Sequence, residues 1–306
     1  MDVFKFQIPE EEEGLRIDKY LSANLDFLSR SYIQKMIQEG KVSVNGRAVK
    51  SKYTLRSEDE VEFCLPPSVE PEILPQNIPL DILYEDGDVI VVNKPKGMVV
   101  HPAPGHYGDT LVNALLFHCR DSLSGINGIM RPGIVHRIDK DTTGSLIVCK
   151  NDLAHESIAR QLKEHTITRC YRAVCMGILK EDEYHIDAPI GRHPIERKKM
   201  AVNQRKGKAA ITHVKVLKRL NNATYIECCL ETGRTHQIRV HLSSMGHPLL
   251  GDELYGDTKN RFHLQGQTLH AYILGFSHPK DNRYIETKAE LPEYFENLLM
   301  KLQHFS

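Results

Sequence analysis

The chain of 306 residues is long enough for one large domain, or for a large domain with a small companion. Hydrophobic residues make up 41% of it and charged residues 26%, which is typical of a soluble globular protein. Its formal net charge is zero, and no apolar run approaches the roughly 18 residues that a transmembrane helix needs.

Two sequence features indicate the compartment. Residues 1–13 carry an acidic run rather than the basic, apolar pattern of a signal peptide, so we expect a cytoplasmic protein. The seven cysteines are an odd number and form no Cys-x-x-Cys pair. This favours reduced, buried thiols over a disulfide framework or a metal site.

The charges are unevenly distributed. Residues 30–56 contain seven Lys and Arg against one acid, and residues 192–219 contain ten against one. A single basic block is often an ordinary solvated face, but two of them in a neutral chain favour a polyanionic partner. Nucleic acid is the first candidate, and we expect no membrane partner.

The first predicted elements are two helices followed by a hairpin. Residues 14–26 and residues 29–40 both place apolar side chains at helical spacing, and Gly40 ends the second helix. Residues 41–49 alternate around Asn45-Gly46, a strong hairpin signal. A helix-turn-helix DNA reader also contains two helices, but the hairpin that follows directly makes it less favoured.

This segment resembles the S4-type RNA-binding module through the stretches RIDKYL, SRSYIQKMIQEGKVSVNG and EDEVEF. The resemblance implies a small α/β module over residues 1–65, whose second helix and hairpin present a basic face to structured RNA. It assigns that face to Arg30, Ser31, Lys35, Lys41, Asn45 and Arg47.

Prolines separate this module from the rest of the chain, so residues 66–79 are predicted to be a linker. Residues 80–306 form the second predicted domain. Its predicted strands come in adjacent runs rather than in strict alternation with helices. This pattern favours an α+β fold, with a mainly antiparallel mixed sheet and flanking helices, over a doubly wound one.

The stretch GIVHRIDKDTTGSLIVCKND, residues 133–152, holds five ionisable groups within six residues. Because a buried charge costs several kcal/mol unless it is paired, they are expected in a loop at the edge of a sheet. We predict one strand at 133–139 and another at 144–151, with the acids Asp139 and Asp141 between them. The loop is either a solvated turn or a site for chemistry.

One chemical interpretation comes from Asp139, Asp141 and Thr143, which fit the Asp-x-Asp-x-Thr pattern of haloacid-dehalogenase-type phosphatases. Those enzymes also need acids that hold magnesium, for which residues 251–257 would have to serve. The strand and helix alternation expected after such a motif is missing, so this interpretation is not favoured.

A wider match is more specific. HRIDKDTTG resembles the central motif of the RluA-type pseudouridine synthases, and NKPKGMVVHP, RCYRAV and TGRTHQIRVHLSSMGHPLLGDELYG resemble further motifs of that family in the same order. HPAPGHYGDTLVNALLFH is similar to its RluD branch. Ile138 and Thr143 replace the more usual Leu and Ser and keep their shape or hydroxyl chemistry. The resemblance implies an RNA isomerase whose substrate is large-subunit ribosomal RNA. The sequence does not give the oligomeric state, and a design that faces RNA needs only a monomer.

Pseudouridine formation breaks an N-glycosidic bond and rebuilds the link through carbon, so the product is an isomer and no cofactor, metal or redox step is needed. The reaction needs a carboxylate near the ribose and the base. We assign it to Asp139, while the resemblance assigns a guanidinium to Arg239 and an aromatic residue to Tyr171. Whether Asp139 is nucleophile or base, and whether Tyr171 stacks or accepts a proton, stays open.

The remaining positions have supporting roles. By the resemblance, Arg137 occupies the space that the flipped-out uridine leaves, or holds a phosphate. Lys94 and Lys96 would line the rim of the site. Asp141 is expected to be a turn acid that pairs with neighbouring amides or Lys140. A helix is predicted from a cap at Thr235 to Gly246. A binding protein that keeps the fold without the chemistry is the other RNA alternative, and the intact catalytic set argues against it.

Overall fold

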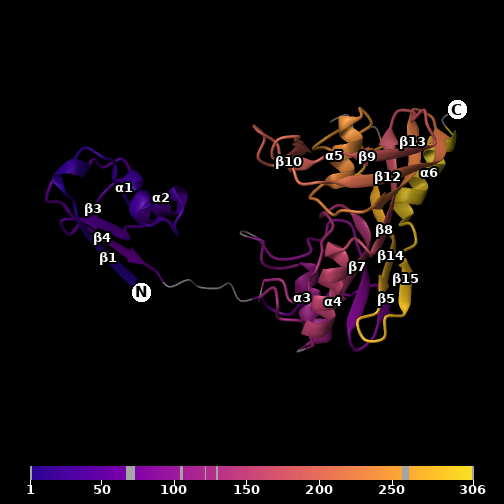
Figure 1. Cartoon of the computed structure of the whole chain (residues 1–306), viewed down its shortest axis with the longest axis horizontal. Coiled ribbons are helices and arrows are strands. Elements are labelled where there is room, and N and C mark those ends of the chain that lie inside the picture. Colours follow the sequence, from indigo (N-terminus) through magenta and orange to yellow (C-terminus); the bar gives the residue numbers. More distant parts are fainter. Residues whose placement is uncertain are drawn as a thin grey trace. The chain divides into compact units, whose positions relative to one another are not determined.

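The computed structural model describes residues 2–66, 73–103, 106–120, 122–128, 130–256 and 262–304. The chain divides into two compact units, Met1–Pro71 and Glu72–Ser306 (Figure 1). Within the described ranges, no helix has the length and apolar character needed to cross a membrane.

The first unit contains the expected helices and hairpin. The Ser29 side chain accepts a hydrogen bond from the backbone N–H of Tyr32 and thereby caps the second helix. Asn45 and Gly46 have φ angles of 50° and 73°, which form the tight turn of the hairpin. The elements are α1 (Ile17–Asn24), α2 (Arg30–Gln38), β2 (Val42–Val44) and β3 (Arg47–Ala48).

Two further strands complete a four-stranded antiparallel sheet in the order β1-β4-β2-β3. They are β1 (Asp2–Gln7), which the acidic N-terminal sequence does not suggest, and β4 (Glu60–Leu65), with the 3-10 turn η1 (Glu10–Glu12) after β1. The helices bury Ile17, Leu21 and Ile33 against Phe63 of the sheet, so this unit has its own hydrophobic core.

In the described part of the second unit, nine strands form one sheet in the order β5-β6-β7-β14-β8-β13-β12-β9, with β15 paired to β14. Only the β7–β14 pair of that sheet is parallel, which confirms the expected α+β class. The strands are β5 (Ile82–Glu85), β6 (Val89–Lys94), β7 (Thr143–Cys149), β8 (Thr168–Met176), β9 (Glu183–Asp187), β12 (Ile211–Leu220), β13 (Ala223–Leu230), β14 (Leu269–Ser277) and β15 (Tyr284–Lys288). A separate ribbon pairs β10 (Ile190–Arg192) with β11 (Met200–Val202).

Helices cover both faces of this sheet. Because neighbouring residues of a strand point to opposite faces, Ile90 and Val92 of β6 pack with α3 (Leu111–Cys119), whereas Val89 and Val91 pack with α4 (Asp152–Lys163). The helix α5 (Gln237–Ser244) joins the cluster of α3, and α6 (Glu293–His304) packs against Val174 of β8. Figure 1 shows α3 and α4 near β5, and α5 with α6 near β9, β12 and β13.

Residues 73–79, which the sequence predicts as linker, pack on the second unit. Ile73 is buried in the same cluster as α3, and the Asn113 side chain donates a hydrogen bond of 2.8 Å to the carbonyl of Leu74. The rest of the predicted linker includes residues 67–72, which lie outside the described residues.

The strand predicted at 133–139 is wrong. This segment makes a single bridge to β7, between Ile134 and Val148. The backbone N–H of Ile147 donates to Nε2 of His136 at 3.0 Å, where a neighbouring strand would offer a carbonyl. A side chain therefore replaces part of the expected ladder, and the backbone of the segment is left free to turn toward Asp139.

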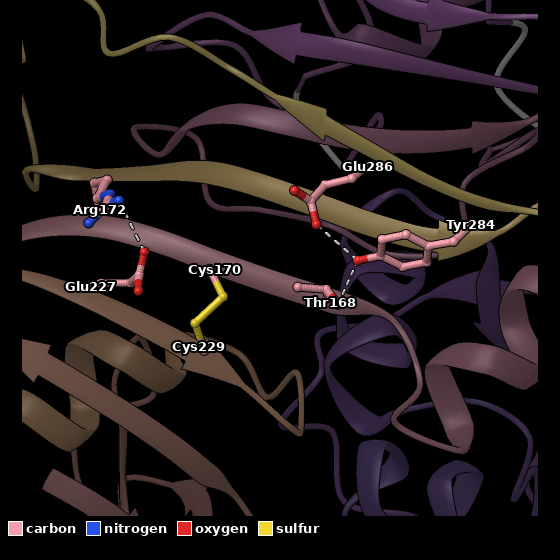
Figure 2. Close-up of a disulfide and its surroundings, with 7 residues drawn as sticks. All are labelled: Thr168, Cys170, Arg172, Glu227, Cys229, Tyr284 and Glu286. Atoms are coloured by element: carbon pink, nitrogen blue, oxygen red, sulfur yellow. Dashed lines mark hydrogen bonds and ion pairs between the residues drawn. A yellow bond between two sulfur atoms is a disulfide. The ribbon is translucent and has the colours of Figure 1, made fainter. Parts of the chain in front are cut away.

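The expectation of reduced thiols is wrong for one pair. Cys170 of β8 and Cys229 of β13 are direct partners in the sheet register, with Cα atoms 4.1 Å apart, and form a disulfide (Figure 2). They are separated by 59 residues in the sequence, so only the register brings them together. An Arg172–Glu227 ion pair lies beside them and links the same two strands. The remaining cysteines are free, as expected.

Candidate active site

The buried side chain of Lys94 anchors the loop that carries Asp139. The ammonium of Lys94 donates to the carbonyls of Pro95, Met98 and Lys140 at 2.8 to 2.9 Å. The backbone N–H of Thr142 donates to the carbonyl of Asp139 and closes a turn. The loop is thus held at its acid and at the next residue by one backbone and one side-chain bond.

The prediction that Lys94 lines the rim is wrong. Its side chain is fully buried, and its three donors are used on carbonyls. Burial lowers the pKa of Lys94 to about 7, against the charges of Asp141 and Asp139. Alternation along β6 points this residue inward, so its role is to hold the loop.

Asp139 is bound by the guanidinium of Arg239. Nη1 of Arg239 donates to Oδ2 of Asp139 at 2.8 Å, and Nε and Nη2 donate to Asp252 at 2.7 and 2.9 Å. Although burial disfavours its charge, the hydrogen bonds to Asp252 and the charge of Asp139 raise the pKa of Arg239. Because the bidentate pair with Asp252 fixes the plane of the guanidinium, the remaining nitrogen aims at Asp139.

His236 lies beside the same carboxylate. It precedes α5 with a left-handed φ of 58°, and its Nε2 is 3.8 Å from Oδ1 of Asp139. Its Nδ1 is 2.8 Å from the Tyr255 hydroxyl, which also accepts a bond from the N–H of Met200. Burial lowers the pKa of His236 even though Asp139 acts in the opposite direction, so the ring is neutral at pH 7. The predicted cap at Thr235 is wrong, because His236 occupies that position without a side-chain cap bond.

Tyr171 lines the cavity that contains Asp139 and Arg239. It lies on β8, only 8% of it is exposed, and burial raises the pKa of its hydroxyl. The hydroxyl has no hydrogen-bond partner among the described residues. Ile138 and Leu269 add apolar walls. The cavity thus combines one oriented carboxylate with an aromatic ring and an apolar lining, which suits a flat base attached to a sugar.

Arg137 is exposed and borders the same cavity, with no hydrogen-bond partner among the described residues. Lys96 lies elsewhere: its ammonium sits 3.8 Å from the centroid of the Tyr294 ring, in a different cavity. Asp141 makes none of the expected bonds to Lys140 or to amides within the described chain, and it lies against Gly266. The structure therefore brings Arg137 to the predicted site but not Lys96.

In the first unit, two predicted RNA-facing groups are already engaged. The guanidinium of Arg30 donates twice to Asp18, at 3.1 and 2.8 Å. The Asn45 side chain donates to Asp59 and accepts from the N–H of Glu60, so it shapes the hairpin. The outward cations of that set are Lys35, Lys41 and Arg47, and Ser31 lies beside them on α2 with its hydroxyl 3.1 Å from that of Ser29.

Sequence reasoning missed two residues of the site, His236 and Asp252. Both lie inside the long motif at 232–256. His236 is marked only by its contact with Asp139, about a hundred residues away, and Asp252 only by its bonds to Arg239, so no local spacing identifies them. A third missed residue, Arg169, does have a signal, because it stands two positions before Tyr171 and shares its face of the strand.

Comparisons with known proteins decide the family. A family model described as RNA pseudouridylate synthase matches residues 88–244, and an S4 domain model matches residues 15–61. The chain belongs to the RNA pseudouridylate synthase family, of the RluA type. It is therefore an isomerase that acts on RNA, as the motifs predict.

Individual relatives agree along nearly the whole chain. The chain is 52% identical over 294 residues to the uncharacterized RNA pseudouridine synthase YlyB of Bacillus subtilis, which covers 96% of each chain. It is 47% identical over 307 residues to ribosomal large subunit pseudouridine synthase D of Zymomonas mobilis, again 96% of each. The solved structure of human RNA pseudouridylate synthase domain containing 1 matches with a TM-score of 0.56 and 27% identity, over 76% of this chain and 97% of that one.

Proposed function

We propose that this pseudouridine synthase modifies specific uridines of large-subunit ribosomal RNA, with Asp139 as its essential catalytic carboxylate. The relative from Zymomonas mobilis carries that substrate in its name, which supports the class of RNA. The S4 module, through Lys35, Lys41 and Arg47, binds folded RNA while the second unit performs the chemistry. The enzyme works in the cytoplasm as a monomer, because one chain supplies both the carboxylate and its guanidinium.

The bond of 2.8 Å between Arg239 and Asp139 carries the assignment. It joins residues 100 positions apart that both line one cavity. A carboxylate fixed in this way stands ready beside the ribose, either to attack the sugar or to remove its 2′ proton. Arg239 keeps it oriented, and its buried partner Asp252 keeps Arg239 in place.

The uridine must leave its stack to reach Asp139, which costs a few kcal/mol. Arg137 is exposed directly beside the pocket, and we assign it to the space that the base vacates. Tyr171 forms the face on which the detached uracil rests. Because burial raises its pKa, the phenol stays protonated at pH 7, which favours stacking over proton removal.

Tritium release from ribosomal RNA labelled at uracil carbon 5 tests the proposal. Asp139→Ala and Asp139→Asn should lower the rate at least about 1000-fold, as loss of a catalytic nucleophile or base does, while RNA binding survives. Asp141→Asn is the matched control, two residues away in the same loop, and should stay active. Tyr171→Phe keeps the ring and should retain most activity if the ring acts as a platform.

Three outcomes would contradict the proposal in different ways. Turnover by Asp139→Ala would remove Asp139 from the mechanism. Release from transfer RNA or small-subunit RNA alone would replace the substrate but keep the site. Inactivity of Tyr171→Phe would move Tyr171 from the stacking role to proton transfer.

A further inference from the structure

A second cavity opens beside the catalytic pocket, and its lining carries charge of one sign. It has a volume of about 480 Å³ and shares Arg137, Tyr171 and Arg234 with the pocket. Lys163 and Arg169 add two more basic side chains, and of the described residues that line it none is acidic. A cavity of this size holds a ligand rather than a few waters, and its lining selects an anion.

Of the basic side chains that line this cavity, Arg169 is the one that is buried without an anionic partner among the described residues. Only 7% of the residue is exposed, its Nη2 donates to the carbonyl of Glu231 at 3.0 Å, and its buried Nε has no hydrogen-bond partner. It forms no ion pair with any carboxylate in the described ranges. Arg239 is equally buried but binds two carboxylates. An unpaired buried charge costs several kcal/mol, so an external counterion would strongly stabilise Arg169.

The surrounding backbone is shaped to hold this side chain. Arg169 and Tyr171 are alternate residues of β8 and therefore face the same side, about 7 Å apart. A Cβ on Gly233 would lie 2.6 Å from Nη1 of Arg169, so the guanidinium lies against the backbone of Gly233, where a side chain would displace it. Cys170, between the two, points to the opposite face and is bonded to Cys229 of the neighbouring strand. The disulfide therefore holds together the two strands that position Arg169.

We propose that this cavity binds the backbone phosphate of a nucleotide that flanks the target uridine, with Arg169 as its anchor. The inference rests on the proposed function, because the uridine must occupy the pocket of Asp139 for its neighbour to reach Arg169. A phosphodiester offers two oxygens to a guanidinium, which matches the free donors of Arg169. Arg137 and Arg234 border both cavities and line the path between base and phosphate.

Arg169→Met tests the anchor in the full-length enzyme. The variant should fold, because an apolar side chain of similar length replaces an unpaired buried charge. With ribosomal RNA as substrate, KM for tritium release should rise about ten- to a hundred-fold, with little change in kcat. The slope of log affinity against log salt should fall by about 0.7, as expected for one lost phosphate contact to a single strand.

Arg172→Met is the matched control. It lies on the same strand but on the other face, where it pairs with Glu227 at 3.2 Å, so it should leave KM and the salt slope unchanged. Gly233→Ala is a second route, because the new methyl group displaces the guanidinium without removing it. It should raise KM in the same direction as Arg169→Met but less strongly.

Inorganic phosphate separates this proposal from the proposed function. At matched ionic strength against chloride, phosphate should raise the unfolding temperature of the wild type and of Arg172→Met but not of Arg169→Met. If the wild type shows no turnover, the proposed function fails and this measurement alone decides whether the cavity binds anions. If phosphate still raises the unfolding temperature of Arg169→Met, Arg169 is not the anchor. If that rise is lost in Arg169→Met but KM is unchanged, the cavity binds an anion other than the RNA phosphate.

Discussion

The catalytic pocket and the basic face of the first unit use cations in opposite ways. In the pocket, the Arg239 side chain is 8% exposed and shares its charge between Asp139 and Asp252. On the first unit, the Lys35 side chain is 65% exposed, and its ion pair with Glu39 is 3.6 Å long. Buried paired charges fix geometry, whereas exposed charges supply affinity that salt screens. Changes to the first should lower kcat, and changes to the second should lower RNA affinity.

Arg169 combines features of both regions. It is buried like Arg239 but, among the described residues, lacks a carboxylate partner, as do the Lys41 and Arg47 side chains of the first unit. An RNA phosphate would give Arg169 an anionic partner, as Asp139 and Asp252 do for Arg239. We therefore expect that the pocket of Asp139 is organised before RNA binds, and that an RNA phosphate completes the adjoining cavity.

The largest effect that sharpens this comparison is expected from Asp252→Asn. The substitution keeps the shape of the side chain but removes the charge that holds Arg239, so the guanidinium loses its fixed plane. A displacement of about 1 Å in a catalytic group can cost on the order of 100-fold in rate. We expect kcat to fall by about that factor with KM little changed, measured by tritium release.

The neighbouring exposed acid gives the control for Asp252→Asn. Glu253→Gln removes the same charge one residue later and should leave kcat unchanged. Urea unfolding of both variants would show whether the loss of rate reflects lost folding. A larger increase of KM than decrease of kcat would mean that Asp252 acts on binding, and the comparison would fail at this site.

Reduction of the disulfide should have the next largest effect, on stability rather than on rate. Cys170 and Cys229 are 59 residues apart, and the entropy of closing such a loop corresponds to at most about 4 kcal/mol. We expect a reductant to lower the free energy of unfolding in urea by up to that amount. Turnover at 25 °C should be unchanged, because Cys170 faces away from Tyr171.

A variant without both sulfurs, Cys170→Ala with Cys229→Ala, should be insensitive to the reductant. Equal stability of the wild type with and without reductant would show that the native protein keeps these thiols free. That result would restore the expectation drawn from the sequence, since disulfides are rare in reducing compartments.

Local sequence signals predicted much of the fold. The Asn45-Gly46 hairpin, α2 and β8 follow from residues that are neighbours along the chain. The errors have a common cause in long-range contacts. The register of β8 and β13 pairs Cys170 with Cys229, and the His136 ring takes the place of a strand partner for Ile147.

The site shows the same division. Motif resemblance selected Asp139, Tyr171 and Arg239, and the structure brings all three to one cavity. The sequence near Lys94 does not show that its side chain points inward, and the sequence near Arg239 does not show its bond to Asp252. Each depends on how separate segments pack.

His136 should make the stability of the second unit depend on pH. Burial, with Arg169 nearby, lowers the pKa of His136 from 6.5 to about 3, and its Nε2 accepts the N–H of Ile147. Below pH 6.5 the unfolded chain binds a proton that the folded chain refuses, so stability falls with pH down to about 3. At pH 4.5 this histidine should account for a loss of about 2 kcal/mol relative to pH 7.

His136→Gln keeps an acceptor for Ile147 but cannot titrate. Its loss of stability between pH 7 and pH 4.5, measured by urea unfolding, should therefore be smaller than that of the wild type. His185→Gln, at an exposed position, is the control and should lose as much as the wild type. Parallel pH curves for the wild type and His136→Gln would show that this ring is not a buried neutral group.

The smallest effect is expected from removing exposed cations of the first unit. This change tests directly whether they supply RNA affinity and not catalysis. Lys35→Ala combined with Arg47→Ala removes two exposed cations from α2 and the hairpin. The affinity for ribosomal RNA should fall several-fold at low salt, and the slope of log affinity against log salt should fall by about 1.4 to 1.8, for two lost phosphate contacts. The kcat should not change, because neither residue supports the catalytic pocket.

Lys5→Ala combined with Lys19→Ala removes the same charge from outside the predicted face and distinguishes a defined face from net charge alone. If this control lowers the salt slope as much as Lys35→Ala with Arg47→Ala, the first unit attracts RNA by its overall charge. If only Lys35→Ala with Arg47→Ala lowers the salt slope, α2 and the hairpin contact the phosphates. In that case the enzyme keeps affinity and catalysis on separate residues, and RNA binding can be changed without changing the chemistry.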